Sequence, residues 1–179
     1  MMIEISLIRD LVAIFGVIAG FSYYVLMVRN QSKERKIQNF MTLLERRRTP
    51  QTYRDSFQIL QIEWKDYNDY IEKYDSSVDL ENASLRNAIW AFYDGVGLSL
   101  KENMIDAETV YSLLGMQSLL VWFKWETVIK KIREGTLGDD WMENFEYLAN
   151  RMIKMRQERG KKLPTELLHP TSTLQGKYS

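Results

Sequence analysis

Apolar residues form one long uninterrupted run near the N-terminus. Residues 11–28, LVAIFGVIAGFSYYVLMV, contain no charged side chain. At about 1.5 Å per residue, a helix of this length rises about 27 Å, close to the thickness of the hydrocarbon core of a bilayer. Tyr23 and Tyr24 lie toward one end, where aromatic rings favour the headgroup zone. The pattern predicts a transmembrane helix within an anchor of residues 1–30.

A cleaved signal peptide and a buried core helix are the alternatives to a retained span. A signal peptide begins with a basic segment. The first ten residues here carry Glu4, Arg9 and Asp10, one basic and two acidic groups. A core helix of a soluble protein would carry charged residues on its solvent face, and residues 11–28 have none. We therefore expect the span to be retained.

Basic residues cluster directly after the span. Arg29, Lys33, Arg35 and Lys36 follow it, whereas Arg9 alone precedes it. By the positive-inside tendency, the N-terminus is expected outside a cell membrane and the remainder of the chain in the cytoplasm. The same four side chains are candidates for contact with anionic lipid headgroups, although a topology signal alone also explains them.

Small residues line one face of the expected span. Gly16 and Gly20 are four residues apart, and Ala13 lies on the same face. Small residues at this spacing let two membrane helices approach closely. The pattern indicates a homo-oligomer or a protein partner bound through the membrane helix, although glycine is also frequent in such helices by chance.

Helical periodicity continues after the span. An apolar seam with spacings of four and three is formed by Tyr53, Phe57, Leu60, Trp64, Tyr67, Ile71 and Tyr74. We expect it to be one packed face of the bundle, with a break possible at residues 62–66. Thr49 followed by Pro50 predicts a helix start, as does Asp106. The expected helices cover residues 31–48, 49–74, about 80–103, about 107–133, and a last one that starts at Asp139 or Asp140.

These elements predict an all-α fold. One N-terminal transmembrane helix continues into a cytosolic helical bundle of about five helices, residues 31–158. The uncharged stretch 109–123 is short for a bilayer, so a central core helix is expected there rather than a second span. The periodicity stops at Gly160, and residues 159–179 are expected to form a disordered tail.

Composition argues against several classes of function. Lys+Arg and Asp+Glu are equal at 24 each, so a nucleic-acid partner is not expected. The chain has no cysteine and one histidine, His169, in the expected tail, which argues against serine–histidine and cysteine–histidine catalysis. Carboxylates such as Glu63 and Asp66 lie off the apolar seam and are interpreted as solvated. We expect no enzyme, cofactor or metal site.

Aromatic residues are the remaining candidates for a binding site. Trp90, Trp122 and Trp125 could line a pocket, although aromatic residues at helical spacing more often form a core. Gly95 and Gly97 interrupt the expected helix over residues 80–103, which also carries Trp90. Two glycines there indicate that a neighbouring element packs closely against this helix.

Two stretches resemble a known family. FYDGVGLSLKENMIDAETVYSLLG (residues 92–115) and IEWKDYNDYIEKY (residues 62–74) are similar to segments of an uncharacterised prokaryotic family, domain of unknown function 4760. The order of membrane helix, basic junction and helical domain is similar as well. The resemblance implies a membrane-anchored helical domain and supplies no activity.

Two hypotheses of function follow. The first is a single-pass interaction or accessory-subunit protein whose partners are membrane lipid and either a second protein or a second copy of the chain. The alternative is a membrane-tethered sensor or effector that binds a small ligand in its aromatic helical core.

Overall fold

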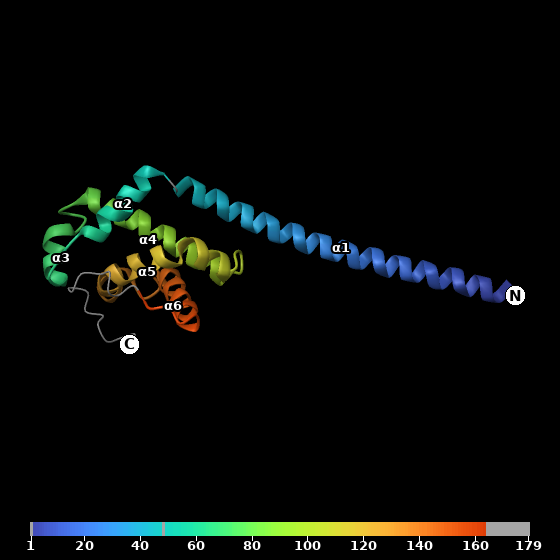
Figure 1. Ribbon diagram of the computed structural model, residues 1–179. Coiled ribbons are helices and arrows are strands. Elements are labelled where there is room, and N and C mark those ends of the chain that lie inside the picture. The colour runs from blue at the N-terminus through green and yellow to red at the C-terminus, as the bar shows by residue number, and fades with distance from the viewer. Residues whose placement is uncertain (1, 48, 164–179) are drawn as a thin grey trace. The chain divides into compact units, whose positions relative to one another are not determined.

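The fold is all-α. The computed structural model describes residues 2–47 and 49–163, and these residues form helices, turns and loops without any strand. The all-α prediction is confirmed. The chain divides into two compact units with the boundary after Arg46 (Figure 1).

The first unit is one long helix. Helix α1 (Met2–Arg47) runs without interruption through the apolar run and the basic residues that follow it. Its stretch Val12–Thr42 is long and apolar enough to cross a membrane. The described apolar side chains of residues 12–28 are exposed, with Phe15 at 68% and Val17 at 73%. Since this apolar surface packs against nothing else in the unit, it needs an apolar environment from elsewhere.

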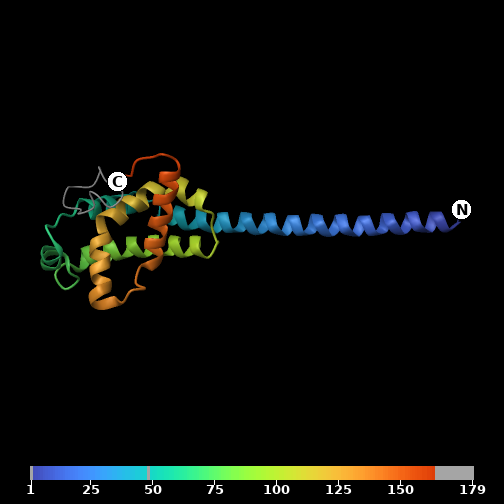
Figure 2. The same cartoon turned by 90° about the horizontal axis from the view of Figure 1, so that it is seen from below.

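The second unit contains the remaining helices. In chain order they are α2 (Pro50–Gln61), α3 (Tyr67–Tyr74), α4 (Leu80–Lys101), α5 (Ala107–Ile132), the π-helical turn η1 (Arg133–Leu137) and α6 (Glu143–Glu158). Helix α6 packs chiefly against α4 and also contacts α5 (Figure 2).

Side-chain caps fix the starts of two helices where the sequence predicted them. The Thr49 hydroxyl accepts a hydrogen bond from the Thr52 N–H at 3.1 Å, and Pro50 is the first residue of α2. Asp106 accepts from the Thr109 N–H at 2.8 Å before α5. Each cap satisfies an N–H group that has no partner within its own helix.

The segment predicted as one helix over residues 49–74 is two helices. Helix α2 ends at Gln61, and the backbone of Ile62 is extended. Helix α3 starts after Asp66, whose carboxylate accepts from the N–H groups of Asn68 at 2.9 Å and Asp69 at 3.0 Å. The break that the sequence left open is therefore present, and Asp66 stabilises the restart.

This break corrects the predicted apolar seam. Tyr53 and Phe57, at its start, are 45% and 63% exposed, whereas Ile59 and Ile62 are buried. Because the chain changes direction after α2, the 3.5-residue spacing does not continue along a single face. The seam prediction is wrong for the first half of the segment.

Helix α5 forms the centre of the second unit. Its residues 121–126 are all buried. The Trp125 ring lies 4.7 Å from the ring of Trp64, 5.2 Å from that of Trp90 and 6.0 Å from that of Tyr70, between centroids. A central core helix was expected here, and the aromatic rings of α3, α4 and the α2–α3 connection gather around it.

Helix α6 begins later than predicted. Asp139 and Asp140 lie in the turn before it, and Met142 has a left-handed backbone (φ 58°) without a side-chain cap of its own. Asp94 of α4 supplies the missing acceptor: its carboxylate accepts from the Phe145 N–H at 2.9 Å. The start of α6 is therefore set by tertiary contact, which the local sequence does not show.

The predicted disordered tail, with His169, falls almost wholly on residues 164–179, which lie outside the described residues.

Candidate functional site

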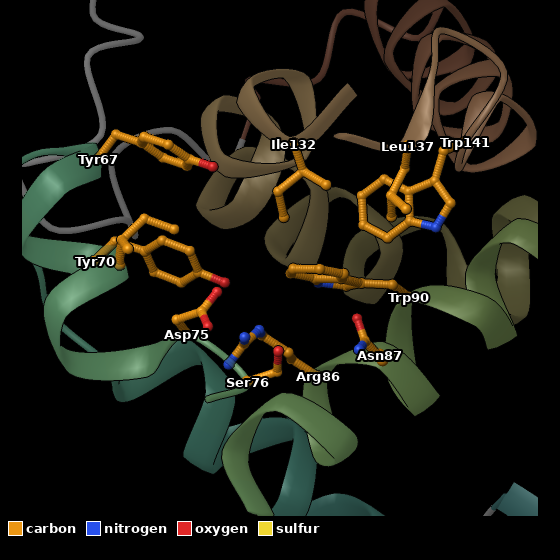
Figure 3. Close-up of a pocket in the computed structure, with 11 residues that line it drawn as sticks. Tyr67, Tyr70, Asp75, Ser76, Arg86, Asn87, Trp90, Ile132, Leu137 and Trp141 are labelled. Atoms are coloured by element: carbon orange, nitrogen blue, oxygen red, sulfur yellow. The ribbon is translucent and has the colours of Figure 1, made fainter. Parts of the chain in front are cut away.

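A cavity of about 290 Å³ opens between α3, the first half of α4 and the end of α5 (Figure 3). All of its lining residues belong to the second unit. They are Tyr67, Tyr70, Ile71, Asp75, Ser76, Arg86, Asn87, Trp90, Ile132, Leu137 and Trp141. Its volume is near the lower limit of small-molecule sites, which are about 300–1,000 Å³.

One side of the cavity is apolar. Trp90 and Trp141 meet edge to face, with centroids 5.8 Å apart and an interplanar angle of 80°. Ile132 and Leu137 lie beside them (Figure 3). Leu137 is the last residue of η1, and single π-helical turns occur often at functional sites. The π turn places Leu137 beside the cavity after α5 ends.

The opposite side carries a buried cation. Arg86 is only 4% exposed, and its guanidinium carbon lies 5.3 Å from the ring centroid of Tyr70 and 5.8 Å from that of Trp90. Its Nη1 donates to the Asn82 Oδ1 at 2.9 Å. Among the ion pairs of the described residues, none includes Arg86. Burial lowers the pKa of Arg86, but an arginine remains charged at neutral pH.

Tyr70 and Asp75 lie on the same side as Arg86 (Figure 3). Burial raises the pKa of Tyr70 to about 12, so its hydroxyl stays protonated at neutral pH. The Asp75 carboxylate accepts from the Ser77 N–H at 2.9 Å and from the Ser77 hydroxyl at 2.7 Å, and these bonds lower the pKa of Asp75. This side of the cavity therefore holds one positive and one negative group.

Two buried N–H donors of lining residues have no hydrogen-bond partner among the described residues. They are Arg86 Nε and Trp90 Nε1. Buried donors are nearly always paired in folded proteins, so each of these two lacks a bond that it would usually make, as do the indole N–H groups of Trp122 and Trp125 in the core. The arrangement can hold a planar ring on its aromatic side and hydrogen-bond acceptors near Arg86. Within the described part of the chain, no group of three or more His, Asp and Glu side chains is placed to hold a metal ion.

The aromatic residues singled out in the sequence have different locations. All three tryptophans are buried: Trp90, 0% exposed, lies beside the cavity, and Trp122 and Trp125, 1% and 0% exposed, lie deeper in the core. Gly95 and Gly97 lie further along α4 and do not line the cavity.

Gly97 and Gly95 differ in their surroundings. A Cβ at Gly97 would lie 1.8 Å from the carbonyl oxygen of Asn144 at the start of α6, while one at Gly95 would meet no atom within 4 Å. The expected close neighbour is therefore present at Gly97 alone. Together with Asp94, Gly97 forms the docking site for the first turn of α6, which explains these two residues of the Asp-Gly-Val-Gly sequence.

The residues proposed for membrane contacts lie along α1. Gly16 and Gly20 have no atom within 4 Å of an added Cβ, and Ala13 is exposed, so their common face is unoccupied within the unit. Arg29 and Arg35 are exposed. Lys36 is exposed too, and the side chain of Lys33 lies outside what the structure describes.

Sequence reasoning missed Arg86, Tyr70 and Asp75 as site residues. A signal for Arg86 was present, because Asn82, Arg86 and Trp90 follow one another at four-residue spacing on one face of α4. A charged residue in line with a buried tryptophan indicates a polar group directed into the core.

An ionic network joins α5 to the start of α6. Glu146 pairs with Arg133 and lies 3.6 Å from the Lys130 ammonium. Burial raises the pKa of Glu146, but the hydrogen bond and charge of Arg133, assisted by Lys130, outweigh it, so the net pKa is lowered. A carboxyl whose pKa is lower in the folded state stabilises the fold above its unfolded pKa of about 4.3, and this contribution is lost as the pH falls through the folded pKa.

We therefore expect Glu146→Gln to reduce the stability at pH 7 by about 1 kcal/mol, a small effect because solvent partly screens the pair, in which the Glu146 side chain is 29% exposed. The difference in stability between Glu146→Gln and wild type should shrink below about pH 4. Thermal unfolding followed by circular dichroism at pH 7 and at low pH measures both values. Glu143→Gln is the control, because Glu143 pairs with Lys101 in an exposed bridge. Equal losses in the two variants would contradict the account.

The chain belongs to an uncharacterised family. The model of the Domain of unknown function (DUF4760) matches residues 6–152, which include most of α1, the cavity and the start of α6. No curated protein and no solved structure matches the chain. The resemblance read from residues 62–74 and 92–115 is thereby confirmed.

Proposed function

We propose that the protein is a single-pass membrane-anchored interaction or accessory protein, and that the second unit works at the cytoplasmic face of a cell membrane. The observation that carries the proposal is the exposed apolar surface of α1, which includes 18 consecutive uncharged residues. Leaving that many apolar side chains in water would be costly, and insertion into a bilayer removes the cost. Arg29 and Lys36, which follow the run, favour a cytoplasmic second unit and contact with anionic lipid headgroups.

Assembly through the membrane helix is part of this proposal. The face of α1 formed by Ala13, Gly16 and Gly20 has no bulky side chain of its own, which suits a closely packed second helix. A second copy of the chain or the span of another protein would supply it. Neither catalysis nor nucleic-acid binding is part of the proposed role.

Exchange of both glycines tests the assembly. The variant Gly16→Leu/Gly20→Leu should convert the wild-type assembly to a particle with the mass of one chain, because leucine holds the helices apart. Ser22→Leu is the control, since at 100° per residue it adds bulk on a different face. The full chain is purified in mild detergent, and its mass and protein composition are determined together. An unchanged mass and composition in the glycine variant would refute assembly through this face.

A membrane-tethered sensor or effector is the second candidate function. The observation that favours it is the cavity beside Arg86, with its aromatic side and its two unpaired N–H donors. A ligand bound only by the native state would raise the unfolding temperature. This candidate is compatible with the anchor, because α1 contributes nothing to the cavity lining.

A further inference from the structure

The cavity beside Arg86 combines a buried cation with aromatic side chains, and membrane anchoring requires neither. We propose that it binds a small aromatic carboxylate, with the ring against Trp141 and the apolar side chains of Ile132 and Leu137, and the carboxylate toward the Arg86 guanidinium. The inference rests on the second candidate function and gives its ligand a chemical class. It is independent of assembly through α1.

Size and shape favour a ring compound. At about 290 Å³, the cavity holds a molecule of one or two rings rather than a nucleotide or a long acyl chain. Trp90 is 0% exposed and already meets Trp141 edge to face, so a planar ligand would contact Trp141, either stacked on its face or against its edge. Aromatic pairs favour both geometries.

Charge favours an acid. The Arg86 guanidinium is held between two aromatic rings and by a neutral amide, Asn82, and pairs with no carboxylate among the described residues. Its planar fork of N–H donors matches a carboxylate in two-point contact. One of those donors, Nε, has no partner in the described residues. A bound carboxylate would give Arg86 the direct ion pair that it forms with none of the described carboxylates.

The negative charge of Asp75 counteracts the attraction of an acid to Arg86. It lines the same cavity, and together with Asp79 it attracts Arg86 over a longer range. Its carboxylate is already bonded twice to Ser77, whereas Arg86 has no direct ion pair. We therefore expect the cation to dominate binding and Asp75 to weaken it. Asp75→Asn keeps an oxygen acceptor for Ser77, removes the negative charge and should tighten the binding of an acid.

The test compares an acid with its neutral counterpart. The full chain in mild detergent is titrated with 4-fluorobenzoate and with 4-fluorobenzamide, and binding is followed by fluorine NMR of the probes. Wild type should bind the benzoate about tenfold more tightly, as expected for a charge-assisted hydrogen bond. Arg86→Met should remove this preference. Arg151→Met, which removes an exposed arginine of α6 that does not line the cavity, should leave it unchanged.

The outcomes separate the inference from the proposed functions. Equal affinity for both probes in wild type would overturn the aromatic-acid assignment and leave a ligand sensor standing. Binding of neither probe would overturn the assignment and count against the sensor, while assembly through α1 is decided by mass.

If circular dichroism shows that Arg86→Met does not fold, Arg86→Lys takes its place. It keeps the charge without the planar fork and should bind the benzoate several-fold more weakly than wild type. Unchanged binding there would overturn the role of Arg86.

Discussion

Gly97→Ala should destabilise the second unit by about 3 kcal/mol, at the upper end of the usual cost of overpacking. The new Cβ would lie 1.8 Å from the carbonyl oxygen of Asn144 and 2.5 Å from its carbonyl carbon. Both atoms are backbone, so no side-chain rotation relieves the overlap. Helix α6 would have to move away from α4, which also stretches the bond from the Phe145 N–H to Asp94.

Gly95→Ala is the matched control for this prediction. It is the same substitution two residues earlier in α4, where the added Cβ meets no atom within 4 Å. Alanine favours a helix interior over glycine by about 1 kcal/mol, so this variant should be as stable as wild type or more stable. Thermal unfolding followed by circular dichroism compares the two variants. A Gly97→Ala protein as stable as Gly95→Ala would show that α6 does not pack on α4 as described.

Trp125→Ala should cost about 3–5 kcal/mol of stability, the range for removing a large buried aromatic side chain. Trp125 is fully buried, and its ring is surrounded by those of Trp64, Tyr70 and Trp90. The loss combines the transfer free energy of the indole with the cavity that it leaves. Chemical denaturation of the purified full chain measures the change in free energy.

Phe57→Ala is the control for Trp125→Ala. It also truncates an aromatic side chain to alanine, but Phe57 is 63% exposed, and its loss should change the stability by less than about 0.5 kcal/mol. The variants Trp125→Ala and Phe57→Ala together discriminate between the observed core and the apolar seam expected from spacing. In that seam, Phe57 was expected to be buried. Similar losses in the two variants would favour the seam.

Elements whose signals are local in sequence were predictable. The uncharged run gave the long apolar helix, and Thr49, Pro50 and Asp106 gave two helix starts, because a cap lies within three residues of the N–H group that it satisfies. The central place of α5 followed from its low charge, since a stretch without charged side chains has no face to present to water.

The errors arose where distant residues decide the local structure. Helix α6 starts at the position where Asp94, 51 residues earlier, accepts from the Phe145 N–H, and no pattern in residues 139–145 encodes that partner. The cavity beside Arg86 combines α3, α4 and the π turn, and it is visible only once these are packed together. Gly97 was recognised as a close-packing position, but its partner, Asn144, was not.

Membrane topology tests the central claim most directly. The full chain, with one epitope before Met1 and another after Ser179, is expressed in bacteria, and the spheroplasts are treated with external protease. We expect the protein in the membrane fraction, with the N-terminal epitope digested and the C-terminal one protected until the cells are lysed. A protein in the soluble fraction would contradict anchoring by α1, and digestion of the C-terminal epitope in intact spheroplasts would contradict a cytoplasmic second unit.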